Sequence, residues 1–292
     1  MSPGGEETGL NSVTDHDLMT SIARIAAFFG ALVCLCTTAA AVATVDKLYE
    51  ARTIVTGERE ETRIPGITEC FKDVLVKASG DPRLLSDPRA GELSEHAVDY
   101  VRGYRYRDRM EGIPIHDEQG SRDRPYDLTV DFDPEKVDAA LRTLGRKPWG
   151  AARPRIALFI AVRVGDAAYV LADDGNFGRD QRDSLAAASW QMGVSIALPS
   201  EAALAAAGVS LETLPKLDLA QLDNVARRIG GDLPLSGDLF WERGRGGWLA
   251  HWQLRSGDRI YHWEIQDVNF DDAFRSALRG AALILSGNGA PR

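Results

Sequence analysis

The sequence predicts an α+β protein of two small domains, each a mixed or antiparallel sheet packed with helices. A chain of 292 residues is long enough for two hydrophobic cores of ordinary size. Strand patterns of period two and amphipathic helical patterns occur in both halves. Between the halves lies GRKPWGAARPR, whose composition is typical of a linker. The expected ranges are a tail with a signal peptide (1–43), a first domain (44–147), a linker (148–154), a second domain (155–286) and a disordered tail (287–292).

An uncharged apolar run covers residues 25–45 and is preceded by Arg24. The triplet AVA that ends at Ala43 has the small-x-small pattern that signal peptidase cleaves. We therefore expect an exported, periplasmic protein with no integral membrane span after cleavage. The alternative is an inner-membrane anchor formed by residues 25–45, which are long enough to span. Because the residues before the run are acidic, Met19 suits an export signal better than Met1 as the true start.

The first domain opens with a strand over residues 48–57, followed by a helix that Pro65 begins and Gly80 ends. Cys70 shares one face of that helix with apolar side chains. Free cysteine is usually buried as a small hydrophobe, so Cys70 is expected in the core. It is the one cysteine left after signal cleavage, so no intramolecular disulfide is expected. Two Asp-Pro turns and a short helix follow.

Two charged strands come next, YRYR within residues 101–107 and the alternating RPYDLTVDFD after it. If they pair antiparallel, Arg105 and Arg107 meet Asp127 and Asp131 as ion pairs on the solvent face. Such pairs explain the charges without catalysis. Asp133 is then expected to cap a helix that ends at Gly145.

The second domain begins with IALFIAV, an apolar strand of the kind that is buried on both faces. A hairpin partner, a helix over residues 179–192, a short strand at VSIAL and alanine-rich turns follow. Asp218 caps a further amphipathic helix, which glycine ends. DDGN near residue 174 lacks calcium-loop spacing and is expected to be a turn.

The register of a tryptophan-rich hairpin follows from its turn. Gly257-Asp258 suits a type II′ turn, which pairs Trp252 with Trp263 on an apolar face. The tryptophans are expected to pack in the core rather than to form a platform for a ligand. On the polar face His251, His262 and Glu264 could form a two-histidine, one-carboxylate metal site, but a solvated face is the favoured interpretation.

The candidate binding site is the loop from Asp108 to Arg124, which is far longer than a hairpin requires. We expect it to contact a protein partner; the alternative is a loop that contacts only solvent. Its neighbouring side chains point to opposite sides of an extended chain, so no metal site is expected. No catalytic residue and no cofactor are assigned. The expected contact residues are Arg109, His116, Asp117, Glu118 and Arg122.

Charge and motifs limit the classes of function. The formal net charge of −9 disfavours nucleic acid as a partner. No phosphate-binding glycine loop, nucleophile elbow or helical zinc motif is found. We therefore expect an exported cell-envelope protein of unknown activity. A non-catalytic binding or assembly module with an envelope protein partner is favoured over an enzyme. The alternative is a periplasmic hydrolase or metal-dependent enzyme. The oligomeric state is left open.

Three segments, VLVKASGDPRLL, YRYRDRMEGIPIHDEQGSRDRPYDLTVDFDP and RPRIALFIAV, resemble exported bacterial proteins known as domain of unknown function 2066. That resemblance implies no activity and no site residues. The second half more loosely resembles the α/β domain at the front of TolB and in CsgG-type envelope lipoproteins, by the order of its elements. This second resemblance implies an envelope binding module.

Overall fold

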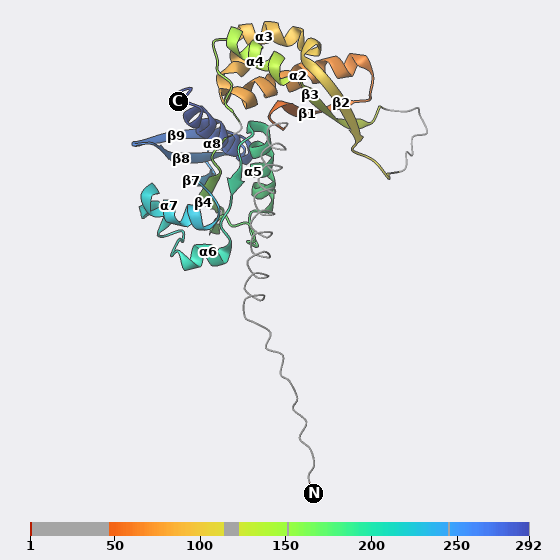
Figure 1. Ribbon diagram of the computed structural model, residues 1–292. Helices are drawn as coiled ribbons and strands as arrows, with labels where there is room; N and C mark the ends of the chain where they lie inside the picture. Colours follow the sequence, from red (N-terminus) through yellow and green to blue (C-terminus); the bar gives the residue numbers. More distant parts are fainter. Residues whose placement is uncertain (2–46, 114–122, 151, 245, 292) are drawn as a thin grey trace. The chain divides into compact units, whose positions relative to one another are not determined.

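The computed structural model describes Met1, residues 47–113 and residues 123–291 apart from positions 151 and 245 (Figure 1). Residues 2–46 are not described, so the expected signal peptide (1–43), from its second residue on and with Met19 and Ala43, and the alternative anchor (25–45) lie outside the described residues. The α+β class is confirmed, with one three-stranded antiparallel sheet and one six-stranded mixed sheet. No described helix has the length and apolar character needed to cross a membrane.

The three-stranded sheet has β3 at its centre. Short helix η1 (Lys47–Tyr49) leads into β1 (Glu50–Thr56), and β3 (Pro125–Phe132) lies between β1 and β2 (Val101–Asp108). Both pairings are antiparallel, as expected for β2 and β3. The predicted alternation of β3 is confirmed on its core side, where three side chains are fully or almost fully buried: Leu128, Val130 and Phe132.

Helix α2 (Glu60–Ser79) covers this sheet, and its start corrects the sequence-based prediction. Pro65 was expected to open the helix but lies inside it. Because proline has no N–H, Pro65 removes one backbone hydrogen bond from the helix. Close packing of the helix on β1 offsets this loss: Gly66 lies so near the strand that an added Cβ would be 2.7 Å from Val55 Cγ1. Gly80 ends the helix as predicted, in the left-handed conformation with φ of 72°. Cys70 is fully buried, as expected, and burial raises the pKa of its thiol.

Aspartates cap three of the four remaining helical segments of this half. Asp133 accepts the backbone N–H groups of Glu135 and Lys136, which confirms its predicted capping role. Two Asp-Pro-Arg tripeptides begin at Asp81 and Asp87, and each aspartate caps a helical segment. The segments are η2 (Pro82–Ser86), α3 (Pro88–Glu95), η3 (Ala97–Tyr100) and α4 (Pro134–Thr143).

The six-stranded sheet is built on two parallel strands, β4 (Ile156–Val164) and β7 (Leu233–Glu242). The first seven residues of β4 are buried, which confirms the prediction of a strand covered on both faces. The strand order is β5-β4-β7-β8-β9, with β6 pairing to β4. The other strands are β5 (Ala167–Val170), β6 (Ile196–Ala197), β8 (Gly247–Ser256) and β9 (Arg259–Val268).

The predicted hairpin register of β8 and β9 is confirmed. Ser256 pairs with Arg259, and Trp252 pairs with Trp263. Gly257 has a φ of 59° and no positive φ occurs at Asp258, as a type II′ turn requires. Both paired tryptophans are buried, which confirms that they pack in the core.

Helices cover both faces of this sheet. α8 (Phe270–Leu285) packs on β8 and β9 and against α5 (Arg179–Met192), whose predicted range is confirmed. α7 (Leu219–Arg228) packs on β7, and Asp218 begins it with a capping box. Short α6 (Glu201–Ala206) and η4 (Leu214–Lys216) complete the helices of this half.

Arg153, in the expected linker, contacts the main chain of three segments. Its guanidinium donates to the carbonyl oxygens of Lys77 (2.8 Å), Trp149 (2.7 Å) and Gly193 (3.1 Å). It also donates to Met192 and Gly150. Burial lowers the pKa of Arg153 to about 10. The division into two separately folded domains at 148–154 stays a prediction, which limited proteolysis between 147 and 153 checks.

Candidate functional site

Of the five residues predicted to form a binding loop, the structure describes Arg109. Its Nε lies 3.5 Å from Asp127 Oδ1, on the outer face of the three-stranded sheet. The remaining four, His116, Asp117, Glu118 and Arg122, lie outside the described residues. The structure therefore shows where the loop begins and ends, and the contacts of those four residues stay a prediction.

The two ends of this loop are joined by a pair of charged side chains. Arg124 Nη1 donates to Asp108 Oδ2 at 2.6 Å, and Arg124 Nη2 donates to the carbonyl oxygen of Ile113 at 2.5 Å. Asp108 Oδ1 also accepts the backbone N–H of Met110 at 2.8 Å. The bond from Met110 and then that from Arg124 hold the pKa of the Asp108 carboxyl below its usual range. The base of the loop is thus a closed, hydrogen-bonded ring.

The predicted ion pairs between β2 and β3 are confirmed. Arg107 Nε donates to Asp127 Oδ2 at 3.0 Å, and Arg105 Nη1 donates to Asp131 Oδ2 at 3.1 Å. Arg105 also reaches Glu50 on β1 at 2.6 Å. The arginine side chains are exposed, but that of Asp127 is only 8% exposed because β3 is the central strand. These charges bind one another and account for the arginine-rich stretch structurally.

The polar face of the β8–β9 hairpin brings together the residues that the sequence placed there. His251 lies opposite Glu264, with 3.4 Å between Nε2 and Oε2, and Gln253 lies opposite His262. A hollow of about 240 Å³ borders both histidines. Among the residues that the structure describes, no group of three or more histidine, cysteine, aspartate or glutamate side chains could hold a metal ion.

A hollow with a volume of about 630 Å³ lies between η2, β9 and α8. This size is ordinary for a small-molecule site. Apolar groups, among them Trp263 and Leu283, form most of its wall, and Arg83 and Arg279 supply positive charge. A Cβ on Gly280 would lie 2.5 Å from Trp263 Cε2, so α8 passes directly over the indole. Only glycine allows this approach.

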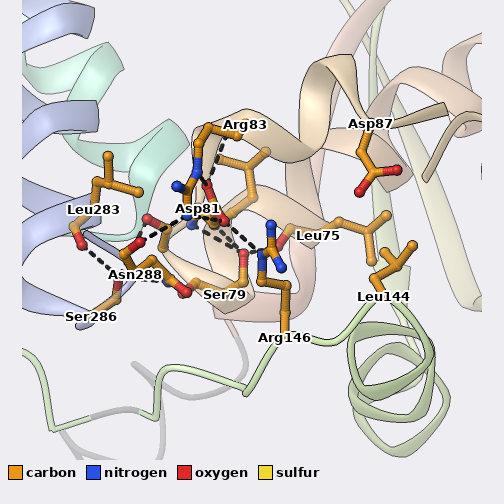
Figure 2. A network of polar contacts seen from close by, with 12 residues as sticks. Leu75, Ser79, Asp81, Arg83, Asp87, Leu144, Arg146, Leu283, Ser286 and Asn288 are labelled. Carbon is orange, nitrogen blue, oxygen red and sulfur yellow. Dashed lines mark hydrogen bonds and ion pairs between the residues drawn. The ribbon is translucent and has the colours of Figure 1, made fainter. Parts of the chain in front are cut away.

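A polar network lies next to this cavity and is shown in Figure 2. The fully buried Asp81 carboxylate accepts from Arg83 Nε and Nη2 at 2.7 and 2.8 Å and from Arg146 Nε at 2.7 Å. Burial acts to raise the Asp81 pKa, but the bonds from the two arginines prevail and lower it. Asp81 therefore holds Arg83 in a fixed orientation at the cavity wall.

The chain's C-terminal part completes that wall. Arg83 Nη2 donates to the carbonyl oxygen of Asn288 at 2.8 Å, and Asn288 Nδ2 donates to that of Ser79 at 2.9 Å (Figure 2). Asn288 falls within the stretch 287–292, which was expected to be a disordered tail. Ala290 and Pro291 also border the cavity. The last turn of α8 and the residues after it are thus tied to the start of η2.

Arg279 differs from Arg83 because no carboxylate among the described residues lies within ion-pair distance of it. Its Nε is shielded from solvent and has no hydrogen-bond partner. The nearby Asp272 is bound by Arg275, with 3.2 Å between Nε and Oδ1. Burial, and then the charge of Arg275, lower the pKa of Arg279. A half-buried cation without its own counter-ion therefore lines the cavity.

A second buried cation, Lys77, has a full set of partners. Its side chain is 1% exposed, and Nζ donates to the carbonyl oxygens of Glu50 (2.8 Å) and Lys47 (3.3 Å). Nζ also lies 3.9 Å from the ring centroid of Trp190. Burial lowers the pKa of Lys77 to about 8. Lys77 thus joins α2 to α5 and has a structural role.

Sequence reasoning did not identify Arg83, Arg279 or Trp263 as site residues. Asp81-Pro82 was interpreted only as a turn, and Trp263 only as a core residue. One available signal was Gly280 inside the pattern of the last helix, since glycine there costs about 1 kcal/mol relative to alanine and indicates a close approach. The cavity itself joins segments that are distant in sequence.

A protein-family model matches part of the chain. The model of a domain of unknown function (DUF8605) matches residues 42–150. As the resemblance implied, the match is to a domain without an assigned activity, but its number differs from that of domain of unknown function 2066. The matched range lies close to the expected first domain, 44–147. Comparison with curated proteins gives no match.

Proposed function

We propose that this chain is an exported cell-envelope protein that acts as a non-catalytic binding or assembly module, with the loop after β2 contacting a protein partner. The observation that carries the proposal is the closed base of the loop, where Arg124 bridges Asp108 and Ile113. Fixing both ends reduces the conformational entropy that the intervening residues lose when they bind.

Charge supports a protein partner for this loop. His116, Asp117 and Glu118 are separated by a few positions from Arg122, so the loop offers both signs of charge within a short stretch. Mixed charges suit the polar contacts of a protein interface. The order of elements in the second half, which resembles that of TolB and CsgG-type domains, supports a place in the envelope.

A crosslinking pull-down tests the loop. We expect the triple variant His116→Ala, Asp117→Ala and Glu118→Ala to lose one or more partners that the wild-type chain captures. A matched control likewise removes one histidine and two carboxylates, on the exposed surface around α3, with Glu92→Ala, Glu95→Ala and His96→Ala. If both triple variants stay folded and capture the same partners as wild type, the loop has no binding role.

Export is tested separately by the mass of the mature chain. Cleavage after Ala43 leaves a chain that begins at Thr44 and is recovered from the periplasm. A chain recovered with residues 25–45 intact in the membrane fraction would replace this proposal with the inner-membrane anchor.

A further inference from the structure

We propose that the cavity between η2, β9 and α8 binds the carboxylate of an organic acid with an apolar body, and that Arg279 pairs with that carboxylate. The inference is independent of the loop proposal and concerns a different surface. It is argued from the volume of the cavity, from the side chains that line it, and from the hydrogen-bond partners of Arg83 and Arg279.

The volume and lining fit an amphipathic small ligand. The cavity has a volume of about 630 Å³, and most of its wall is apolar, with Trp263, Ile265, Val268 and Leu283 contributed by β9 and α8. Sites for small molecules combine such apolar walls with a few polar groups that fix orientation. An apolar ligand body would lie on these side chains and displace water from them.

The polar groups of the wall select an anion. Asp81 pairs with both Arg83 and Arg146, and Asp272 is paired with Arg275. Asp73 is near enough for its charge to act on Arg279 but forms no ion pair with it, so four arginines face three carboxylates here. A net positive region in a chain of net charge −9 attracts an anionic group and disfavours a cation. Arginine binds carboxylates through several N–H donors without exchanging a proton, which suits binding rather than acid-base chemistry.

Arg279 is the group that lacks a partner. Its Nε is shielded from solvent without a hydrogen-bond partner, and no carboxylate among the described residues forms an ion pair with its guanidinium. Since Nε is shielded, the ligand carboxylate pairs with the terminal nitrogens of the guanidinium, which supplies the missing counter-charge. Arg83 contributes less, because Asp81 and the Asn288 carbonyl oxygen already accept from its Nε and Nη2.

Calorimetric titration of the full chain tests this assignment with octanoate and with octanol as the matched neutral probe. We expect octanoate to bind and octanol to bind at least about tenfold more weakly. Arg279→Gln, which keeps most of the side chain and removes its charge, is expected to weaken octanoate binding by about tenfold or more. Arg259→Gln, at the exposed tip of the β8–β9 hairpin, is the matched control and should bind as wild type does.

Two further arms make the test decisive. A tripeptide ending in leucine is titrated with a free C-terminal carboxylate and, as its control, as the C-terminal amide. Binding of the free form alone indicates a peptide terminus as the ligand, whereas binding of octanoate without the tripeptide indicates a free aliphatic acid. Ser86→Trp narrows the cavity from an exposed position and should abolish binding even if Arg279→Gln fails to fold. The proposal is overturned if no carboxylate binds, if octanol binds as tightly as octanoate, or if neither variant weakens binding.

Discussion

The outer face of the three-stranded sheet and the cavity beside α8 both contain arginines, but they use them differently. On the sheet, Arg105 and Arg107 each have a carboxylate partner on the neighbouring strand. In the cavity, Arg83 is held by Asp81, whereas Arg279 forms no ion pair among the described residues and its Nε has no hydrogen-bond partner. The sheet is conspicuous in the sequence and the cavity is not.

The difference shows that the density of charged residues is a poor guide to function. Alternating arginines and aspartates on paired strands satisfy one another, and such exposed pairs contribute little stability. A single cation whose donors are unmet is more informative, because proteins pair nearly all buried polar groups. Variants at Asp81, at Lys77 and at the Arg107–Asp127 pair test how much paired charges contribute when they are buried and when they are exposed.

The largest effect is expected at Asp81. Asp81→Ala leaves Arg83 and Arg146 without their shared carboxylate and should lower the free energy of unfolding by about 3–5 kcal/mol. Chemical denaturation measures this loss. Asp87→Ala is the matched control, since Asp87 begins the same Asp-Pro-Arg tripeptide but is more exposed. Equal losses in the two variants would contradict the structural role given to Asp81.

A pH-dependent effect is expected at Lys77. Its pKa is about 8 in the folded chain, against the usual 10.5 of lysine. Between these pH values the unfolded chain binds a proton that the folded chain has released, so the free energy of unfolding rises with pH. We expect wild type to gain on the order of 3 kcal/mol relative to Lys77→Met across that window.

Denaturation at a series of pH values checks this gain. The half-exposed Lys72 on the same helix provides the control variant Lys72→Met. A difference between wild type and Lys77→Met that stays constant from pH 8 to 10.5 would show that Lys77 is not buried as the structure describes.

The smallest effect is expected for the ion pair between Arg107 and Asp127. A double-mutant cycle with Arg107→Ala and Asp127→Ala should give a coupling energy of about 1 kcal/mol or less, because the arginine is exposed and screened by salt. The measurement is repeated at high salt, where the coupling should fall further. A coupling above about 2 kcal/mol would place this face among the strongly stabilising regions.

Local patterns predicted most of the secondary structure. The hairpin register followed from Gly257-Asp258, because a one-residue shift would have placed Trp252 and Trp263 on opposite faces of the hairpin. The caps at Asp133 and Asp218 were also predicted, since a capping residue acts within its own turn. Pro65 was misplaced because the contact of α2 with the sheet compensates for its missing N–H.

The candidate site could not be predicted in the same way. Asp81, Arg146, Arg279 and Asn288 are brought together by tertiary packing, and no periodicity within one segment encodes that meeting. The pairing of parallel β4 and β7 likewise joins strands far apart in sequence. By contrast, the ion pairs of Arg105 and Arg107 were predicted, because β2 and β3 are consecutive strands whose alternation fixes which side chains face each other.

The contacts of Arg153 have a consequence for motion. One guanidinium donates to carbonyl oxygens of Lys77, Trp149 and Gly193, at the ends of α2, the linker and α5. Rotation about the linker would have to break several hydrogen bonds in one step, so small independent swings of the segments are suppressed. Opening at this junction is expected to be a rare, all-or-none event on the slow timescale of local unfolding rather than a continuous hinge movement.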